Sequence, residues 1–566
     1  MDEKIQKVRK GGQSQPNLLV DSNSSIGCTE KAKEKAKVII RTSVGRIPVF
    51  ADPPDFQSRV GVWKFSGVSG WRNTSFDDYD RAAHLLCRDK MASLSISEGS
   101  TMSLTNRWWC GHIVIHGTLV LSGMLFANSI LVMPGGRLIL KSGARITLQD
   151  HDREGSKWAG KIIVLGELSA LREEFIVAHI RARRHELWEG QSCIQSEASC
   201  AGWEAKGEVY VEGQDQTFEI EDRTHSRAGT WINFKKGFHR DHRYPHRPVI
   251  ANLSRPIEIL SEFDSSIVVA DDASLRMENV RLSSLELKIQ NVVTSGREWS
   301  VSSCVSDRAI EVKNSPGGAL IDNIVCGENE PGIDIKSDDI SLVGNLCFGK
   351  SVAFKLRDGS KNRLIYNTVA ECEVGFDLKD VHATEFELNN SSMCHVGERI
   401  SVGYEDWLLV SRSKISSCDY GIAILAGNVC VCTPEISHCT EGIGAKRNFS
   451  SVYVMSGNLL ECKTGILVYP GFFPDSFLVD SVCVNATSGI IFVENNIKSL
   501  GFTCEIRDAF ISSPNPITLS KKKGGHDKKQ YSVDVVNYQR TEGENMKLCF
   551  GEGSYPGIDA RIGDIT

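Results

Sequence analysis

Long apolar segments are missing from this chain of 566 residues: no run of about 18 apolar residues occurs, and the polar opening MDEKIQKVRK is not followed by an apolar core. The sequence therefore predicts neither a membrane span nor a secretory signal, and the default expectation is an intracellular or virion protein. No Ser-His-Asp spacing, phosphate-binding loop or dinucleotide fingerprint stands out, which removes the enzyme classes that are easiest to identify from sequence.

Proline is also scarce, at 16 residues, whereas glycine is abundant, at 50. This balance suits short strands joined by tight turns. Apolar residues make up 41% and charged residues 24%, so most of the chain should fold around a real core. The net charge of −6 argues against a generic polyanion binder, and any attraction for nucleic acid or an acidic polysaccharide must come from a local patch.

Composition and periodicity divide the chain into five regions. We expect a flexible polar arm at 1–58, a β-rich domain at 59–168, an irregular insert with a basic, histidine-rich segment at 169–248, a long array of regularly spaced short strands at 249–518, and a basic loop with a C-terminal segment at 519–566. Inside the insert, residues 173–190 are consistent with a short helix, and residues 207–222 look like a hairpin.

A Cys-x-x-Gly motif returns five times in the fourth region, starting at Cys372, Cys394, Cys418, Cys439 and Cys462, with spacings of 22, 24, 21 and 23 residues. A leucine-rich repeat has a similar period but needs a Leu and Asn consensus that is missing here. The repeat therefore predicts an all-β, right-handed, single-stranded parallel β-helix in which the cysteines form a buried, unbonded ladder. Three asparagines near the coil corners are expected to form a turn ladder, namely Asn345, Asn367 and Asn390.

The β-rich region before the insert resembles a known domain. Residues 95–149 resemble the eight-glycine domain of the cell-surface hyaluronidases, the cell migration-inducing hyaluronan-binding protein and fibrocystin-L, with turn glycines at Gly99, Gly117, Gly135, Gly136 and Gly143. Residues 251–262 resemble the strand that opens the β-helix of that family, and residues 308–323 resemble one of its coils. The resemblance implies a β-rich N-terminal domain ahead of a parallel β-helix, an extracellular location, and hyaluronan or a similar acidic polysaccharide as the ligand.

The chain departs from this family at its histidines. The stretch LKIQNV at 287–292 lacks the two histidines of the corresponding family strand, and two further family histidines fall at Lys313 and Pro331. Acid/base or metal chemistry that uses those imidazoles cannot be done here by the same atoms. The family's charged motif after the eight-glycine domain corresponds to a stretch where charge persists, and the candidate catalytic residues are Asp150, Asp152, Arg153 and Glu154. They would supply paired carboxylates for glycosidic cleavage, and the alternative is an exposed turn between two strands.

A second candidate site is the basic segment KKGFHRDHRYPHR at 235–247. Its candidate ligand-binding residues are Lys235, Lys236, His239, Arg240, His242, Arg243, His246 and Arg247. Three interpretations remain open: polyanion binding, a metal held by His239, His242 and His246, and a plain surface loop. An acidic polysaccharide is the expected partner, and nucleic acid is disfavoured because few aromatic side chains stand beside the cations. No cofactor is predicted beyond that optional divalent metal.

Two functions are consistent with these observations. One is a carbohydrate-binding β-helix protein with weak or lost polysaccharide-degrading, hyaluronidase-like activity. The other is a non-catalytic structural or recognition protein, such as a surface coat, a virion spike or a scaffold. Because the repeat is regular and carries little chemistry, we expect any function to lie on the less regular N-terminal half.

Overall fold

The structure is a computed structural model and describes residues 37–42, 45–50, 62–65, 93–149, 160–171, 176–196, 198–214, 216–226, 229–243, 247–292, 299–327, 330–469, 476–493, 502–507, 509–520, 531–536, 549–550 and 558–559. These ranges contain strands and loops but no helix, and therefore no helix that could cross a membrane. An antiparallel pair stands apart from the main sheet, formed by β1 (Lys37–Thr42) and β2 (Gly45–Phe50).

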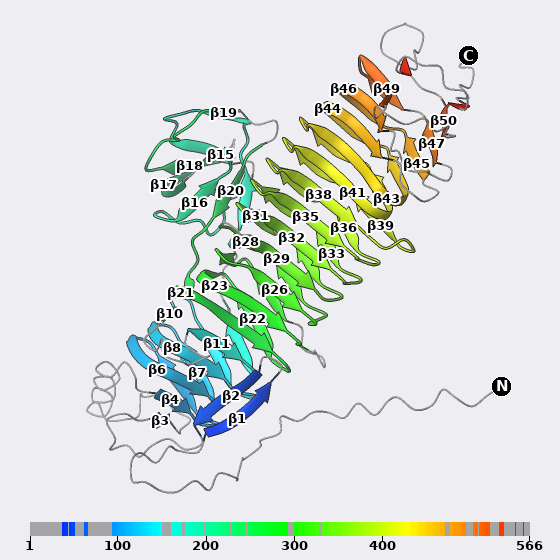
Figure 1. The fold of residues 1–566 in the computed structure, drawn as a ribbon. Helices are drawn as coiled ribbons and strands as arrows, with labels where there is room; N and C mark the ends of the chain where they lie inside the picture. Colours follow the sequence, from blue (N-terminus) through cyan, green and yellow to red (C-terminus); the bar gives the residue numbers. More distant parts are fainter. Residues whose placement is uncertain are drawn as a thin grey trace, which may run out of the picture.

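The main body is an elongated parallel β-helix whose coils stack along one axis (Figure 1). Each coil contributes to three parallel sheets, called sheets 1, 2 and 3 here. Some long strands bend round a corner and serve two sheets. Sheets 1 and 2 share β6 (Arg107–Ile115), β8 (Met124–Val132), β21 (Ile257–Ala270), β23 (Val280–Gln290), β44 (Asn458–Tyr469) and β46 (Cys483–Val493), and sheets 2 and 3 share β41 (Tyr420–Cys432) and β43 (Glu441–Met455).

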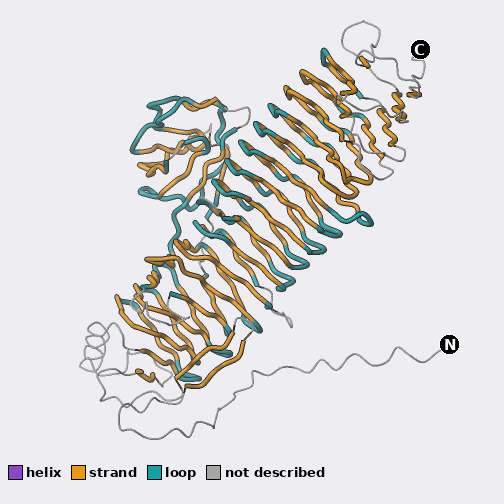
Figure 2. The backbone as a smooth tube through the Cα atoms, in the orientation of Figure 1, coloured by secondary structure: helices purple, strands orange, loops and turns teal. Residues whose placement is uncertain are grey.

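The remaining strands each belong to one sheet, and Figure 2 shows them alternating with loops around the coils. Sheet 1 also contains β10 (Arg145–Leu148), β25 (Val305–Ser306), β28 (Ile324–Val325), β31 (Leu346–Phe348), β34 (Thr368–Ala370), β37 (Asn390–Ser392), β40 (Lys414–Ser416), β42 (Glu435–Ser437) and β48 (Phe510–Ser512). Sheet 2 also contains β3 (Val62–Phe65), β4 (Ser93–Ile96), β11 (Lys161–Val164), β26 (Ile310–Lys313), β29 (Pro331–Lys336), β32 (Val352–Arg357), β35 (Val374–Lys379), β38 (Val396–Ser401), β49 (Asn515–Ser520) and β51 (Cys549–Phe550). Sheet 3 also contains β5 (Thr101–Leu104), β7 (Thr118–Leu121), β9 (Arg137–Leu140), β12 (Glu167–Ala170), β22 (Ser274–Glu278), β24 (Ser300–Ser302), β27 (Ala319–Ile321), β30 (Ser341–Val343), β33 (Arg363–Ile365), β36 (Glu385–Glu387), β39 (Trp407–Ser411), β45 (Ser476–Asp480), β47 (Phe502–Arg507), β50 (Tyr531–Val536) and β52 (Ile558–Asp559).

Alternation along each strand explains how the coils close around a core. In β26, Ile310 and Val312 are buried while Glu311 and Lys313 reach the surface. Because strand residues point alternately to opposite faces, this pattern places one row inside and one outside on every coil. Register then stacks like on like, as where Phe354 lies against Phe376 with ring centroids 4.8 Å apart. The structure confirms the predicted all-β, parallel β-helix.

The region predicted as an N-terminal β domain shares its sheets with the rest of the helix. Strands β10, β11 and β12 pair in parallel with β21 and β22, which follow the insert. Two of its glycines show why that residue is needed: Gly135 has a φ of +81°, and a Cβ on Gly136 would lie 2.1 Å from the Ile115 carbonyl oxygen. The coils before and after the insert therefore form one continuous solenoid.

One ladder of cysteines and one ladder of asparagines run inside the solenoid. All five motif cysteines are buried free thiols, as predicted. The asparagine ladder is real, but the prediction of Asn390 as its third member is wrong. Asn345 Nδ2 donates to Asn367 Oδ1 at 3.0 Å, and Asn367 Nδ2 donates to Asn389 Oδ1 at 3.0 Å. The spacing of 22 residues selects Asn389, whereas Asn390 begins β37 and pairs with Thr368.

The insert forms a small antiparallel β module, which Figure 1 shows beside the solenoid. Its strands are β13 (His179–Arg181), β14 (Glu186–Leu187), β15 (Cys193–Ser196), β16 (Glu208–Val211), β17 (Thr217–Ser226), β18 (Gly229–Phe234), β19 (His242–Arg243) and β20 (Val249–Asn252). The predicted hairpin at 207–222 is confirmed by the antiparallel pairing of β16 with β17. The predicted short helix is wrong for residues 176–190, because β13 and β14 occupy that stretch and pair with β20 and β19.

Candidate functional site

The module is fixed to the solenoid by an apolar contact on sheet 1. Tyr210 of β16 stacks on Phe348 of β31, with ring centroids 3.7 Å apart and an interplanar angle of 7°. Ala178, Val249 and Ala251 of the module join Val305, Ile324 and Leu346 of the solenoid in the same buried cluster. The module is thus held in one orientation by packing as well as by its two chain connections.

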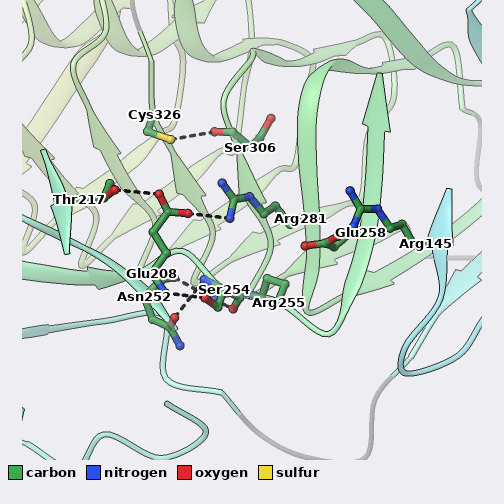
Figure 3. A network of polar contacts seen from close by, with 10 residues as sticks. All are labelled: Arg145, Glu208, Thr217, Asn252, Ser254, Arg255, Glu258, Arg281, Ser306 and Cys326. Atoms are coloured by element: carbon green, nitrogen blue, oxygen red, sulfur yellow. Dashed lines mark hydrogen bonds and ion pairs between the residues drawn. The ribbon is translucent and has the colours of Figure 1, made fainter. Parts of the chain in front are cut away.

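Polar contacts border this apolar cluster, and Figure 3 shows them converging where the chain re-enters the solenoid. Glu208 of β16 accepts hydrogen bonds at 2.8 Å from both Thr217 Oγ1 and Arg281 Nη1, the latter on β23. The backbone N–H of Glu208 donates to Ser254 Oγ at 2.7 Å. One glutamate therefore joins the hairpin, the returning chain and the solenoid.

Arg255 lies at the centre of this junction and is buried. Its guanidinium donates to the carbonyl oxygens of Asn252 at 2.9 Å, of Ser254 at 2.7 Å, and of Ser303. Burial disfavours the charged guanidinium and lowers the pKa of Arg255 to about 10. The strand motif at 251–262 that carries the family resemblance therefore has a structural role here, since it ties the module's exit to the next coil.

A second buried anchor is Glu212, at the end of β16. Its Oε2 accepts the Val249 N–H at 2.8 Å, and its Oε1 accepts the Ser392 hydroxyl at 2.7 Å. Ser392 belongs to β37, which lies two coils beyond the strand that carries Phe348. The module thus spans several coils of sheet 1.

The basic segment lies on this module, and its backbone is fixed by buried side chains of the module. Phe238 is buried against Phe218 and Phe234, with centroid distances of 5.2 and 5.7 Å. The buried Gln214 side chain accepts from the His239 N–H and donates to the Arg240 carbonyl, each at 3.3 Å. These contacts fix the backbone while Lys236, His239 and Arg240 remain exposed.

A neighbouring loop adds to the same surface. Residues 183–189 lie beside the basic segment because β14 pairs with β19, and because the Glu189 N–H donates to Asp241 Oδ1 at 2.7 Å. Together, 183–189 and 235–243 carry six Lys and Arg and three Asp and Glu, a net charge of 6 − 3 = +3 on an acidic protein. Trp188, with 43% of its surface exposed, directly follows the β14 residues that pair with β19. We call this the basic surface: Arg183, Arg184, His185, Trp188, Lys236, His239 and Arg240.

Several predicted site residues fall elsewhere. Lys235 is partly neutralised by Glu219, with Nζ–Oε1 at 2.5 Å. Arg247 is half-buried, and its carbonyl accepts from Arg181 Nη1 at 3.0 Å. For His242 and Arg243 the structure describes the backbone strand β19. His246 and the candidate catalytic residues Asp150, Asp152, Arg153 and Glu154 lie outside the described residues. Within the described part, no group of three His, Cys, Asp or Glu is arranged to hold a metal.

A polar row that we did not predict runs along the Cys-x-x-Gly repeat. The first variable position of the motif is exposed in all five copies and forms a row at one corner: Glu373, His395, Asp419, Thr440 and Lys463. The second position is aligned by register in sheet 2, so that Val396, Tyr420, Glu441 and Thr464 are successive neighbours. The signal was present in the sequence, as titratable residues at variable positions of a fixed period.

Four titratable side chains at these positions, His395, Asp419, Tyr420 and Glu441, lie on three successive coils, and Lys446 lies beside them. His395 Nδ1 lies 2.8 Å from Asp419 Oδ2, and the Lys446 ammonium lies 4.4 Å from the Tyr420 ring centroid. Glu441 bends over Gly444, where a Cβ would lie 1.8 Å from Glu441 Oε1. Burial raises the pKa of the Glu441 carboxyl, and the Lys446 charge opposes this rise. The corner therefore combines an oriented imidazole with a carboxyl whose pKa is raised by burial.

Comparisons with known proteins bear on the fold. A family model for the right-handed β-helix region matches residues 265–433, and no curated protein matches the sequence. Among solved structures, the catalytic domain of a GH87 α-1,3-glucanase in complex with nigerose is 11% identical, with 69% of this chain and 90% of that chain covered and a TM-score of 0.38.

Two phage proteins are also similar. The tailspike gp49 of Pseudomonas phage LKA1 is 9% identical over 82% of this chain and 74% of that chain, with a TM-score of 0.21. The Gp54 tailspike of Acinetobacter baumannii bacteriophage AP22, solved with a capsular saccharide, is 10% identical over 76% of this chain and 70% of that chain, with a TM-score of 0.24. At these values the likeness concerns the β-helix fold and carries no activity to this chain.

Proposed function

We propose that this protein binds an acidic polysaccharide through the basic surface of the inserted module. The observation that supports this most is an exposed tryptophan, Trp188, on a cation-bearing loop that is joined to the basic segment by the β14–β19 pairing and by the Glu189–Asp241 hydrogen bond. Guanidinium and ammonium groups attract carboxylates or sulfates of such a polymer. The flat indole face offers an apolar platform for the C–H face of a sugar ring, with its N–H as a polar handle.

The rigid support of these loops matters for affinity. Phe238, Gln214 and Asp241 fix the loops before any ligand arrives, so less conformational entropy is lost on binding. A polysaccharide is itself long, and the solenoid gives it an extended body to lie along. The hyaluronan suggested by the family resemblance is one member of this ligand class, and its identity is part of the proposal.

The test is a titration of the full chain with hyaluronan and with neutral dextran, at low and high salt. We expect binding to hyaluronan that weakens as salt screens the exposed charges, and no binding to dextran. Lys236→Ala and Arg240→Ala should each weaken binding about fivefold, and Trp188→Ala by more, because an exposed charged contact contributes on the order of 1 kcal/mol. Lys141→Ala, at an exposed turn of the solenoid, is the matched control and should bind as the wild type does.

Three results would count against this assignment. Equal binding of dextran would remove the role of charge. Equal or tighter binding of a single-stranded oligonucleotide would point to a general polyanion site. Loss of binding in Lys141→Ala as large as that in Lys236→Ala would place the ligand elsewhere.

Cleavage of the bound polymer is a second candidate function, favoured by Glu441. Glycosidic hydrolysis uses a carboxyl with a raised pKa as its general acid. In the described part of the chain, burial raises the carboxyl pKa of Asp322, Glu398 and Glu441. Of these, Glu441 has a tyrosine, Tyr420, on the adjacent coil and the oriented His395 one coil further. Shortening of hyaluronan that is abolished in Glu441→Gln, with binding retained, would support it. Unchanged polymer length with wild-type protein would leave the binding function alone.

A further inference from the structure

Two cysteines and a methionine converge on the outer face of sheet 3, away from the interior thiol ladder. In the stretch from Val429 to Cys432, the two valines are fully buried, while Cys430 and Cys432 are half-exposed. Strand alternation therefore directs both thiols to the same outer face. On the next coil, Cys432 is aligned with Met455 by the parallel register of β41 and β43.

Two distances from the Cys430 sulfur are close to metal-ligand spacing. Cys430 Sγ is 3.5 Å from Cys432 Sγ and 3.9 Å from Met455 Sδ. A metal–sulfur bond of about 2.3 Å places three trigonal sulfur ligands about 4.0 Å apart. One of the two distances already has this value, and the other needs an opening of about 0.5 Å, which side-chain rotation can supply.

A disulfide between the two thiols fits the geometry less well. Residues i and i+2 of an extended strand have Cα atoms about 6.5 Å apart, near the upper limit for a disulfide. Bond formation would also need Cys430 Sγ and Cys432 Sγ to close from 3.5 Å to about 2.05 Å. A metal ion bound by both sulfurs would need no such approach of the two Sγ atoms.

The donor set and its surroundings select the kind of metal. Thiolate and thioether sulfurs are soft ligands, which Cu(I) prefers, whereas a zinc site takes four ligands, rarely with a thioether. Leu409 is aligned with Cys430 on one neighbouring strand and Tyr453 on the other. The Trp407 ring lies 4.8 Å from the Tyr453 ring. These neighbours offer no carboxylate or imidazole ligand on that side, which favours an ion that needs few ligands.

We propose that Cys430, Cys432 and Met455 form a three-sulfur site for a soft monovalent metal ion of the Cu(I) type. Binding changes no oxidation state: the ion forms two metal–thiolate bonds and one thioether contact, and two protons leave the thiols for solvent. Each thiol must lose its proton before its sulfur binds the ion. Metal affinity should therefore rise with pH.

The test is an anaerobic titration of the full chain with Cu(I) in competition with bicinchoninate. We expect one equivalent to be held by wild-type protein and lost in both Cys430→Ser and Cys432→Ser. Met455→Leu should keep the equivalent but weaken it about tenfold, because a thioether is the weaker donor. Cys483→Ser, which alters a half-exposed thiol on β46, is the matched control and should bind as wild type does.

X-ray absorption of the loaded protein gives an independent readout, with three sulfur neighbours expected. Unchanged circular dichroism and melting temperature would show that the serine variants are folded. Failure of wild-type protein to compete with bicinchoninate would overturn the proposal. So would retention of the equivalent in Cys430→Ser and Cys432→Ser, or its loss in Cys483→Ser.

Discussion

Glu398 lies inside the solenoid, in a column where the neighbouring coils carry Phe376 and Ile422. It is fully buried, and neither carboxylate oxygen has a hydrogen-bond partner. Burial raises the pKa of the Glu398 carboxyl to about 8, and the nearby Ser413 hydroxyl opposes this shift without reaching hydrogen-bonding geometry. The residue is therefore protonated in the native protein at neutral pH, and its tight site serves neither proposed ligand.

The pH dependence of stability follows from this buried acid. Its ordinary pKa is 4.5, so between about pH 4.5 and 8 the folded chain keeps a proton that the unfolded chain has lost. The free energy of unfolding should then fall as pH rises through this window, by on the order of 4 kcal/mol. Urea unfolding of the wild type and of Glu398→Gln should show this fall in the wild type, with a much flatter curve in the variant.

The exposed Glu405 supplies the control for that measurement. Glu405→Gln should follow the wild-type curve at every pH. Parallel curves for wild type and Glu398→Gln would contradict the buried, protonated state of this residue.

At the level of secondary-structure elements, the asparagine ladder stabilises the corners where one strand of a coil ends and the next begins. Each amide accepts from the coil before it and donates to a backbone carbonyl, as where Asn389 Nδ2 donates to Leu364 O at 2.8 Å and Asn389 Oδ1 accepts from Asn367 N–H at 3.0 Å. All three residues are buried. Removing the Asn389 amide leaves two backbone groups of the preceding coil without these partners and without water.

Asn389→Ala should therefore destabilise the protein by about 3 kcal/mol, since two buried backbone groups lose their partners at about 1–3 kcal/mol each. Asn390→Ala, one residue further along, should cost little because that side chain is outside the ladder. Denaturant midpoints of the two variants provide the comparison. Equal losses would mean that the corner is stabilised by the strand and not by the ladder.

At the scale of the whole molecule, the module's position depends on a few contacts with sheet 1. Tyr210 is buried against the half-buried Phe348, whereas Glu208 and Arg281 keep 37% and 31% of their side chains exposed. Apolar burial therefore contributes more than the half-solvated ion pair. This difference can be measured as the free energy of local opening of the module.

Tyr210→Ala should lower that free energy by about 3 kcal/mol, as for other large-to-small changes in a core, while Glu208→Gln should lower it by about 1 kcal/mol or less. Amide hydrogen exchange in β16 and β20 reports the opening directly. Tyr366→Ala, at a residue with 57% exposure on the solenoid, should leave exchange in the module unchanged. A larger effect from Glu208→Gln than from Tyr210→Ala would reverse the ranking.

The sequence was most informative where structure repeats locally. The Cys-x-x-Gly spacing was enough to predict the coils and the buried thiols, because each coil meets the same steric conditions as the last. The choice of Asn390 over Asn389 failed because two adjacent asparagines differ only in register, which the neighbouring coil decides. The module's sheet joins strands such as β13 and β20 that lie far apart in the chain, so local patterning could not reveal it.

The candidate sites also combine features that local sequence predicts with features that depend on strand pairing. The basic segment was visible as a run of cations, but its partner loop with Trp188 depends on the pairing of β14 with β19. The grouping of His395, Asp419 and Glu441 was not predicted, although the spacing of the repeat was known. Residues 21 to 24 apart become neighbours only once the register between coils is known. We expected the repeat to be chemically silent, and its variable positions are where titratable groups gather.

The stacked coils also act as a ruler. The strand beneath the module, β31, and the strand with the two outward thiols, β41, are separated by three coils in the register of sheets 1 and 2. With about 4.8 Å per coil, the axial offset between the module's seat and the sulfur site is about 14 Å. Gain or loss of one coil between them would change that offset by about 4.8 Å and would leave each surface on the same sheet of the solenoid. The axial distance between the two proposed sites is thus a whole number of coil repeats.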